Sequence, residues 1–525
     1  MPAETNEQIT RSSALISATT ESSRLKGRLS SIFRNLIRIL RKYLTFVGPG
    51  FIIAVSYIDP GNYSTDVAAG ALFQYKMLFI LLLSNAFAIF LQSLSCKLGC
   101  VTGYNLPELC RAQFPFWLNI LLYVFFEVAI LATDLAEVIG TAIALNILFK
   151  IPLVAGVAIT MIDVLIVLCA WKPDGAMRAT RYFEIGVAIL VAMVVCCFIA
   201  LLTKISDIEV KTVLKGYLPN STAFSKSGIY TSLSIMGAVV MPHSLILGTG
   251  LTQPRMMDWD VQHGVYTEDL YEQDSSLCTK YIPSLGAVRH TLSYSIVELT
   301  LSLMTFALFV NSAILIVSGA TLFGVSGAAD ADLFGIHDLL STILSPAAGT
   351  LFAVALLASG QSAGIVTTMA GQLVSEGFFK WTIRPWLRRL ITRSIAVLPC
   401  IIVAGLVGRS GLAQVLNASQ VALSILLPFI TFPIILFTSK QHIMKVATNA
   451  RAIATSEIQH DHVPVQNENT NHSFAQQHEV NEVPQFMDMS NSRLITTLAW
   501  MIWLTIAGLN TYLIVILAQT HGTGT

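Results

Sequence analysis

The chain has 525 residues, of which 54% are hydrophobic and only 12% are charged, with a net charge of +1 and a mean hydropathy of +0.67. This composition is too apolar for a soluble globular protein, and the sequence has no basic segment rich in aromatic residues that would indicate a nucleic-acid partner. It predicts an all-α polytopic membrane protein surrounded by the lipid bilayer.

Residues 1–45 are predicted to form a cytosolic tail. The polar, Ser/Thr-rich start lacks the apolar core of a cleavable signal peptide, so the first transmembrane helix must start insertion. Residues 32–40 place apolar side chains on one helical face and arginines on the other, which is typical of an amphipathic helix at the membrane interface. The basic segment 24–42 has no acidic residue and favours a cytosolic location.

Eleven apolar segments are predicted to cross the bilayer, since about 20 apolar residues span the hydrocarbon core. They lie near residues 46–68, 77–98, 116–146, 152–171, 183–203, 229–251, 294–318, 344–368, 394–412, 417–438 and 495–518. Counting from a cytosolic N-terminus puts the basic loops 172–181 and 380–393 inside, as the positive-inside rule requires, and the C-terminus outside.

Three connecting segments carry further expectations. The extracytosolic loop 206–228 contains Asn220 in an Asn-Ser-Thr sequence, a candidate glycosylation site. The outer loop with Asp330, Asp332 and Asp338 could concentrate cations, although solvated aspartates are the simpler interpretation. Residues 441–493 are predicted to be a cytosolic linker, disordered because the stretch 453–492 is polar and lacks apolar periodicity.

Two motifs interrupt apolar spans at corresponding positions: Asp59-Pro60-Gly61-Asn62 in the first and Met241-Pro242-His243 in the sixth. Proline removes a backbone donor and glycine adds conformational freedom. Helix one should therefore unwind between Asp59 and Asn62, and helix six beside Pro242, which frees the carbonyl near Ala238. Such paired breaks indicate two inverted repeats around a midplane site. We predict repeats at 46–205 and 229–440, with an eleventh helix in 494–525.

The side chains at the breaks indicate a cation site. Asp59 offers a carboxylate, Asn62 an amide oxygen, Ala238 a carbonyl and Met241 a thioether. Thioether sulfur is a poor ligand for Ca²⁺ and Mg²⁺ and a better one for softer transition metals. The set therefore favours Mn²⁺, Fe²⁺ or Cd²⁺, although a methionine in an apolar helix is more often a packing residue.

Together these motifs resemble the natural resistance-associated macrophage protein family of divalent metal transporters. Further matching segments are Thr133-Asp134-Leu135-Ala136-Glu137, the region from Ser359-Gly360-Gln361 to Glu376-Gly377, and, for the fungal members, Gln253-Pro254-Arg255 and Val310-Asn311-Ser312-Ala313. The resemblance implies a LeuT-like 5+5 inverted repeat with broken helices one and six plus an eleventh helix. It also implies proton-coupled import of Mn²⁺ and Fe²⁺, with Cd²⁺ and Co²⁺ as further substrates, by alternating access, without a cofactor or enzymatic activity. Fungal relatives occur at the plasma membrane and at endosomal or vacuolar membranes.

Carried over residue by residue, the resemblance assigns metal binding to Asp59, Asn62, Met241 and the Ala238 carbonyl, and adds Gln420. It assigns proton movement to His243, Asp134 and Glu137, with Arg393 as their counter-charge. It departs at Ser244, where many members have Asn.

Charge interactions support the same scheme, because a dication beside Asp59 favours the ionised carboxylate and a proton must then leave. An intramembrane histidine is a candidate relay for that proton. Two simpler interpretations stay open: His243 braces the helix break, and the two acids of the third span form an ion pair with an arginine.

Three competing functions remain at this stage. A LeuT-like sodium-coupled amino-acid transporter would share the broken helices, but a carboxylate in the first break would repel the substrate carboxylate. A non-transporting metal receptor would use the long linker for signalling. An intramembrane metalloenzyme would need a histidine pair such as HExxH, which the sequence lacks. The sequence leaves the choice between Mn²⁺ and Fe²⁺, the membrane, the proton stoichiometry and the oligomeric state open.

Overall fold

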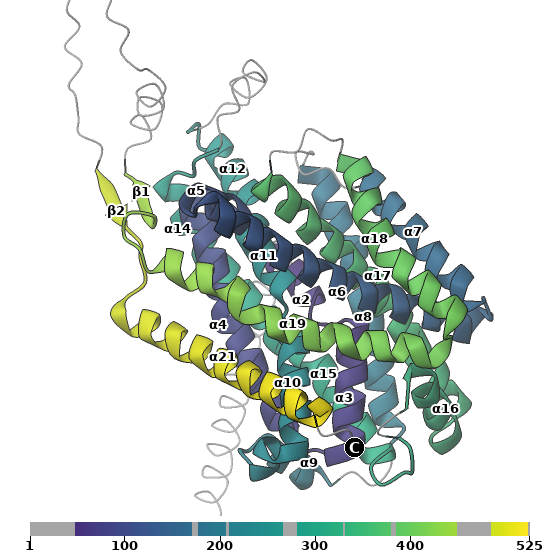
Figure 1. Ribbon diagram of the computed structural model, residues 1–525. Coiled ribbons are helices and arrows are strands. Elements are labelled where there is room, and N and C mark those ends of the chain that lie inside the picture. The colour runs from purple at the N-terminus through teal and green to yellow at the C-terminus, as the bar shows by residue number, and fades with distance from the viewer. Residues whose placement is uncertain are drawn as a thin grey trace, which may run out of the picture. The chain divides into compact units, whose positions relative to one another are not determined.

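A computed structural model describes residues 48–170, 177–205, 209–265, 281–328, 331–379, 385–448 and 485–522 (Figure 1). The predicted tail 1–45 with its amphipathic helix, Asp330, and the middle of the predicted linker lie outside these residues.

The described chain is helical, apart from one small sheet. The helices that form the predicted spans are α2 (Pro49–Val55), α3 (Pro60–Phe73), α4 (Leu78–Thr102), α6 (Phe116–Phe149), α7 (Leu153–Ala170), α8 (Met177–Thr203), α10 (Lys226–Val239), α11 (Pro242–Gly250), α14 (Leu285–Ser302), η2 (a π-helical turn, Leu303–Ala307), α15 (Leu308–Thr321), α17 (Pro346–Phe378), α18 (Pro385–Leu406), α19 (Arg409–Thr438) and α21 (Arg493–Gly522). The connecting elements are α5 (Leu106–Gln113), α9 (Val210–Gly216), η1 (Ser221–Phe224), α12 (Gln253–Gln262), α16 (Leu333–Ile343), β1 (Lys445–Ala447) and β2 (Phe486–Asp488).

The structure confirms that helix one is broken but moves the break towards the N-terminus. α2 ends at Val55 and α3 begins at Pro60, so the non-helical residues are Ser56–Asp59 rather than 59–62. Proline is tolerated at the first helical position because no helical donor is needed there. Asp59 caps α3, with Oδ1 accepting from the Asn62 N–H at 3.0 Å and Oδ2 from the Gly61 N–H at 3.2 Å.

Helix six breaks where the sequence predicts. α10 ends at Val239 and α11 begins at Pro242, so Val240 and Met241 connect the two halves. In a regular helix the Ala238 carbonyl would accept a hydrogen bond from the backbone nitrogen four residues later. That residue is Pro242, whose nitrogen carries no hydrogen. This carbonyl therefore lacks its helical partner.

The packing follows the predicted division into two halves of five spans. The third and eighth spans, α6 and α17, pack against each other. In addition, α6 packs against α19, the tenth span, and α17 packs against α8, the fifth span. These two contacts are equivalent, because spans three and five of the first half correspond to spans eight and ten of the second. Because each half crosses an odd number of times, the second half is inverted relative to the first. The predicted LeuT-like 5+5 fold with an eleventh helix is confirmed.

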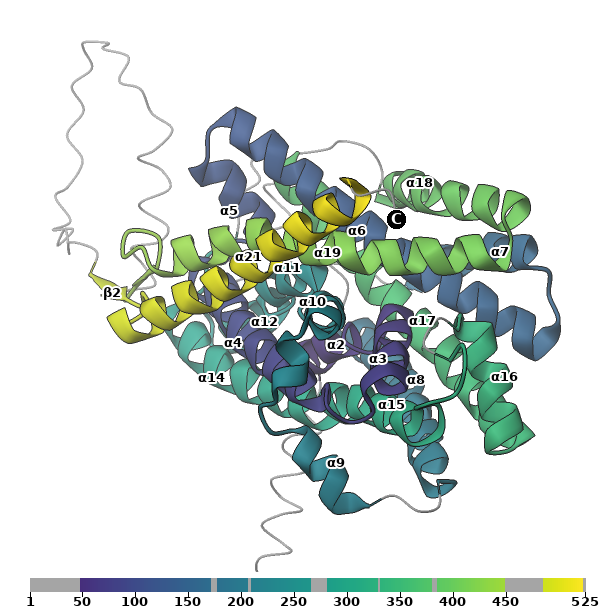
Figure 2. The same cartoon turned by 60° about the horizontal axis from the view of Figure 1, so that its bottom comes forward.

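Both broken helices lie in the middle of the bundle in both views (Figures 1 and 2). In Figure 1, α5, α12 and the sheet lie at the upper end, while α9 and α16 lie at the lower end. These connections alternate between the ends as the predicted crossings require.

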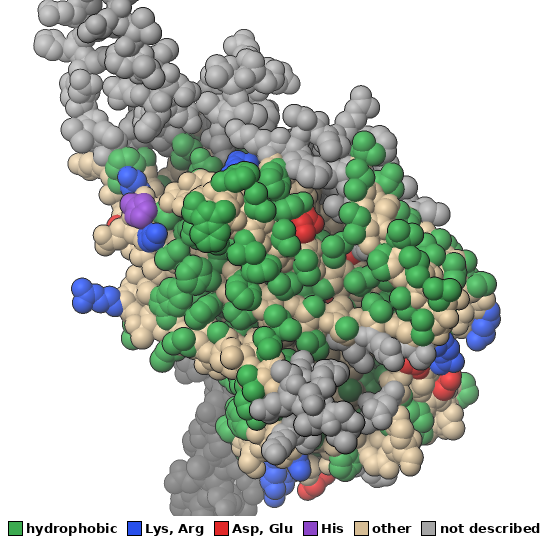
Figure 3. All heavy atoms as spheres, in the orientation of Figure 1, with side chains coloured by type: hydrophobic (Ala, Val, Ile, Leu, Met, Phe, Trp, Pro, Cys, Tyr) green, Lys and Arg blue, Asp and Glu red, His purple; other side chains and the backbone are tan. Residues whose placement is uncertain are grey.

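Eight helical segments among the described residues are individually long and apolar enough to cross a membrane. The predicted first span is divided into the short halves α2 and α3, and the fourth and ninth correspond to α7 and α18. On the face shown in Figure 3, hydrophobic side chains cover most of the described surface, and Lys and Arg lie mainly at its margins. The protein is an integral membrane protein.

Two predicted boundaries are wrong. The ninth span ends at Leu406 rather than 412, and α19 begins at Arg409. Gly408, with a φ of 73°, makes this tight turn, and the polar residues Arg409 and Ser410 that follow it interrupt the apolar sequence only briefly.

The predicted disordered linker 441–493 is ordered at both ends, where β1 pairs antiparallel with β2 and Val446 lies opposite Met487. The sequence did not predict this sheet, because strands of three residues are too short to show an alternation of apolar and polar residues.

The half-helix α2 is fixed to α14 through its N-terminus. Oε1 of Glu298 accepts from the Gly48 N–H at 2.7 Å and from the Phe51 N–H at 3.4 Å. The other oxygen of Glu298 lies 3.6 Å from Nη1 of Arg255, on α12. A buried carboxylate thus caps α2 and connects it to the segment that follows α11.

The half-helix α3 packs closely on α15 at Gly70. A Cβ atom added to Gly70 would lie 2.6 Å from the Leu315 carbonyl oxygen and 2.7 Å from the Gly319 nitrogen, so any side chain would push the backbones apart. Gly186 on α8, in contrast, has open space around the same position.

We expect Gly70→Ala to destabilise the protein by about 1–3 kcal/mol, as overpacking does. Gly186→Ala should be neutral or slightly stabilising, because alanine favours a helix more than glycine. Thermal unfolding of the detergent-solubilised protein measures both. Equal melting temperatures for the two variants would contradict the close approach of α3 and α15.

Candidate functional site

Gln420 on α19 lies beside both broken helices. A Cβ atom added to Gly61, in the first turn of α3, would collide with the Gln420 side chain. A Cβ atom on Gly237, near the end of α10, would lie 3.1 Å from the Gln420 carbonyl oxygen. The hydroxyl groups of Tyr57 and Ser244 are 3.2 Å apart and join the two breaks directly. The structure therefore brings the predicted residues of both breaks to one place.

The predicted ligands at this place are buried and offer oxygen acceptors. Asp59, Asn62, Ala238 and Met241 are fully buried, and Gln420 is almost so. Asn62 donates its Nδ2 hydrogen to the Tyr57 carbonyl at 2.9 Å, and its Oδ1 has no hydrogen-bond partner among the described residues. Oε1 of Gln420 is also without a described partner. Buried acceptors without donors are unfavourable unless something positive binds them.

Two backbone carbonyls of the first break accept hydrogen bonds from side chains that the sequence did not predict to lie there. Asn311 of α15 donates to the Tyr57 carbonyl at 3.1 Å, and Ser359 of α17 donates to the Ile58 carbonyl at 2.8 Å. Both residues lie in segments that carry the family resemblance, but their partners are more than 250 positions away along the chain. Ser244 donates to the Met241 carbonyl at 2.8 Å, so the departure at this position has a local structural role.

His243 is buried, and its two ring nitrogens have different surroundings. The Thr133 hydroxyl lies 3.3 Å from Nδ1 of His243 and 3.0 Å from the Ala129 carbonyl oxygen, to which it can donate. Nε2 of His243 has no hydrogen-bond partner among the described residues.

Helix α6 places Asp134 and Glu137 beside both breaks. Thr133 contacts His243, and a Cβ atom on Gly140 would collide with the Pro60 ring. Both acids are buried, and Glu137 accepts a hydrogen bond from Thr367 of α17. Arg393 belongs to α18, but its side chain lies outside the described residues, so its role as counter-charge stays a prediction.

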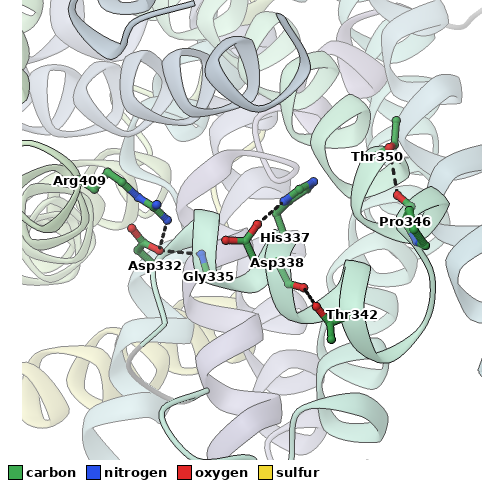
Figure 4. Close-up of polar contacts among 8 residues, drawn as sticks. All are labelled: Asp332, Gly335, His337, Asp338, Thr342, Pro346, Thr350 and Arg409. Carbon is green, nitrogen blue, oxygen red and sulfur yellow. Dashed lines mark hydrogen bonds and ion pairs between the residues drawn. The ribbon is translucent and has the colours of Figure 1, made fainter. Parts of the chain in front are cut away.

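Two aspartates of the acidic loop segment have partners. Oδ1 of Asp332 accepts from the Gly335 N–H at 2.7 Å and lies 3.5 Å from Nη2 of Arg409 (Figure 4). Asp338 pairs with His337 at 3.0 Å (Figure 4).

Asn220 caps η1 and donates to the Lys76 carbonyl at 2.8 Å, so its side chain has a structural role. Its glycosylation remains a prediction.

A membrane-embedded helical bundle with two discontinuous helices and buried acceptors at the breaks is the architecture of a secondary transporter. The chain belongs to the natural resistance-associated macrophage protein-like (Nramp) family, whose model matches residues 50–458.

Sequence relatives and solved structures are consistent with this family assignment. The chain is 52% identical over 476 residues to the manganese transporter pdt1 of Schizosaccharomyces pombe, covering 91% of this chain and 86% of that protein. It is 46% identical over 488 residues to the iron transporter SMF3 of Saccharomyces cerevisiae, covering 92% and 98%. Crystal structures of the Eremococcus coleocola manganese transporter match with a TM-score of 0.69 at 31% identity, covering 90% of this chain and 86% of that one.

The contact of Gln420 with Gly61 predicts a measurable coupling. Gly61→Ala should destabilise the protein by about 1–3 kcal/mol because the new methyl group overlaps the glutamine side chain. In Gly61→Ala/Gln420→Ala the overlap is gone, so the double variant should be more stable than the sum of the single effects predicts. Thermal unfolding of all four proteins tests this coupling. Purely additive losses would show that the two residues do not touch.

Proposed function

We propose that the protein imports divalent transition metal ions into the cytosol by alternating access, coupled to proton entry. Mn²⁺ and Fe²⁺ are the proposed main substrates, with Cd²⁺ and Co²⁺ as further ones. The observation that carries the proposal is the set of buried oxygen acceptors without donors at the two helix breaks, next to the Met241 thioether. The names of the relatives, which include manganese and iron transporters, support it.

The ligand chemistry supports selectivity for transition metals. The Asp59 carboxylate attracts a dication, and the oxygens of Asn62, Gln420 and Ala238 complete a mixed set with the sulfur of Met241. Ca²⁺ and Mg²⁺ gain little from a thioether, whereas softer ions do. The described residues contain no cluster of three His, Cys, Asp or Glu side chains, so the proposed site depends on amides, a carbonyl and sulfur.

Proton coupling follows from charge. Mn²⁺ beside Asp59 favours its ionised form. The buried Nε2 of His243 and the carboxylates of Asp134 and Glu137 lie on α6 and α11 beside the breaks and offer a route for the released proton. We further propose that the N-terminus is cytosolic and the C-terminus extracytosolic, because the basic loops then lie inside.

Mn²⁺ uptake into proteoliposomes with an acidic exterior tests the central site. Asp59→Ala should lower the uptake rate by more than about tenfold, because the charged ligand is lost. Met241→Ala should retain uptake but make it sensitive to competing Ca²⁺. Met501→Ala is a matched control, since Met501 is 54% exposed on α21.

The absence of Mn²⁺ flux at any external pH would refute the proposed function. Unchanged Ca²⁺ competition in Met241→Ala would refute only the thioether as a ligand.

Mn²⁺-driven proton entry, followed with a pH-sensitive dye inside the liposomes, tests the proton route. Asp134→Asn and Glu137→Gln should reduce proton entry more than Mn²⁺ entry, because the metal ligands stay intact. His243→Gln should weaken the acceleration by external acid, since Nε2 can no longer accept a proton. Asp338→Asn, in an outer loop, should behave like the native protein. A constant ratio of protons to Mn²⁺ across all variants would contradict this route.

A further inference from the structure

Asp66 faces α15 from within α3. It lies one turn after Asn62 and one turn before Gly70, so the three residues share one helical face. Both neighbours meet α15: Asn62 and Asn311 donate to the same Tyr57 carbonyl, and Gly70 lies against Leu315. Asp66 is therefore placed in the α3–α15 interface, between these two contacts.

This interface has acceptors without donors. Asp66 is fully buried, and neither of its carboxylate oxygens has a hydrogen-bond partner among the described residues. Oδ1 of Asn311 is likewise buried without a described partner. Nδ2 of Asn311 donates to the Tyr57 carbonyl at 3.1 Å, and no hydrogen bond from it reaches Asp66.

No ion pair formed by the described side chains includes Asp66. A buried carboxylate without a donor or a counter-charge is strongly unfavourable, and a bound cation removes the penalty. A cation site requires oxygen atoms that are not already bound to hydrogen-bond donors, and this helix interface contains such atoms.

We propose that Asp66, with the amide oxygen of Asn311, holds a divalent cation in a second site next to the central one. This inference rests on the proposed function. α3 leads from the helix break towards the end of the bundle where α9 and α16 lie, which is the proposed outer end (Figure 1). Asp66 lies seven residues beyond Asp59, about 10 Å along a helix axis. The second site thus receives the ion before the central site does.

The ligands of the second site are oxygens only. Oxygen ligands bind Mn²⁺ and Ca²⁺ alike, whereas the thioether of Met241 is present only at the central site. The second site therefore collects dications without strong selection, and the choice between them is made one step later.

The test is the number of Mn²⁺ ions bound per full-length chain, measured by calorimetry with MnCl₂ in detergent. We expect two for the native protein, one for Asp59→Ala, one for Asp66→Asn and none for the double variant. Asp338→Asn, which removes an exposed carboxylate, should still bind two. In Asp59→Ala the remaining Mn²⁺ should be displaced by Ca²⁺ at similar concentrations, and in Asp66→Asn it should resist Ca²⁺.

The outcomes separate the two proposals. If the native protein binds one Mn²⁺ that is lost in Asp59→Ala and kept in Asp66→Asn, the second site is refuted while the central site stands. If the native protein neither binds nor transports Mn²⁺, the proposed function itself fails. The Ca²⁺ displacement in Asp59→Ala tests the second site even if Asp66→Asn does not fold. Selective retention of Mn²⁺ there would overturn the inference.

Discussion

The structure depends on a missing hydrogen bond at two positions in the middle of the membrane. Pro60 and Pro242 each lie at the start of a half-helix, where their lack of a donor is tolerated, and each leaves the preceding turn incomplete. In hydrocarbon no water can complete it. The protein supplies donors from other helices for the Tyr57 and Ile58 carbonyls, and Asp59 caps the half-helix that follows. Among the described residues at the breaks, Oδ1 of Asn62 and Oε1 of Gln420 remain without a donor, and a cation could bind them.

Close packing keeps these atoms in place. Glycine at positions 61 and 140 allows Gln420 and the Pro60 ring to come within contact of a neighbouring backbone, which a larger residue would prevent. The α2 half-helix is fixed separately, by Glu298 and its partner Arg255. The half-helix α3 is held mainly against α15, where Gly70 allows the close approach, so the two halves of helix one have different main contacts.

Two polar side chains beside the breaks use only part of their hydrogen-bonding capacity. Nδ1 of His243 lies beside the Thr133 hydroxyl, and Nδ2 of Asn62 donates to the Tyr57 carbonyl. Nε2 of His243 and Oδ1 of Asn62 have no partner among the described residues. Asp332 has a structural role as well, because its Oδ1 caps α16 and lies 3.5 Å from Nη2 of Arg409.

The sequence by itself determined the membrane-spanning helices, the two breaks, and the residue types Asp59, Asn62 and Met241, because hydropathy and proline act locally. It also indicated the family through motifs spread over the chain. It misplaced the first break by about a turn, since capping by Asp59 decides where α3 begins. Only the tertiary structure decided that Gln420 reaches both breaks, that Asn311 and Ser359 complete the unwound backbone, and that Asp66 has no hydrogen-bond partner among the described residues. These are contacts between residues up to several hundred positions apart, and they depend on which helix faces pack together, which local periodicity does not specify.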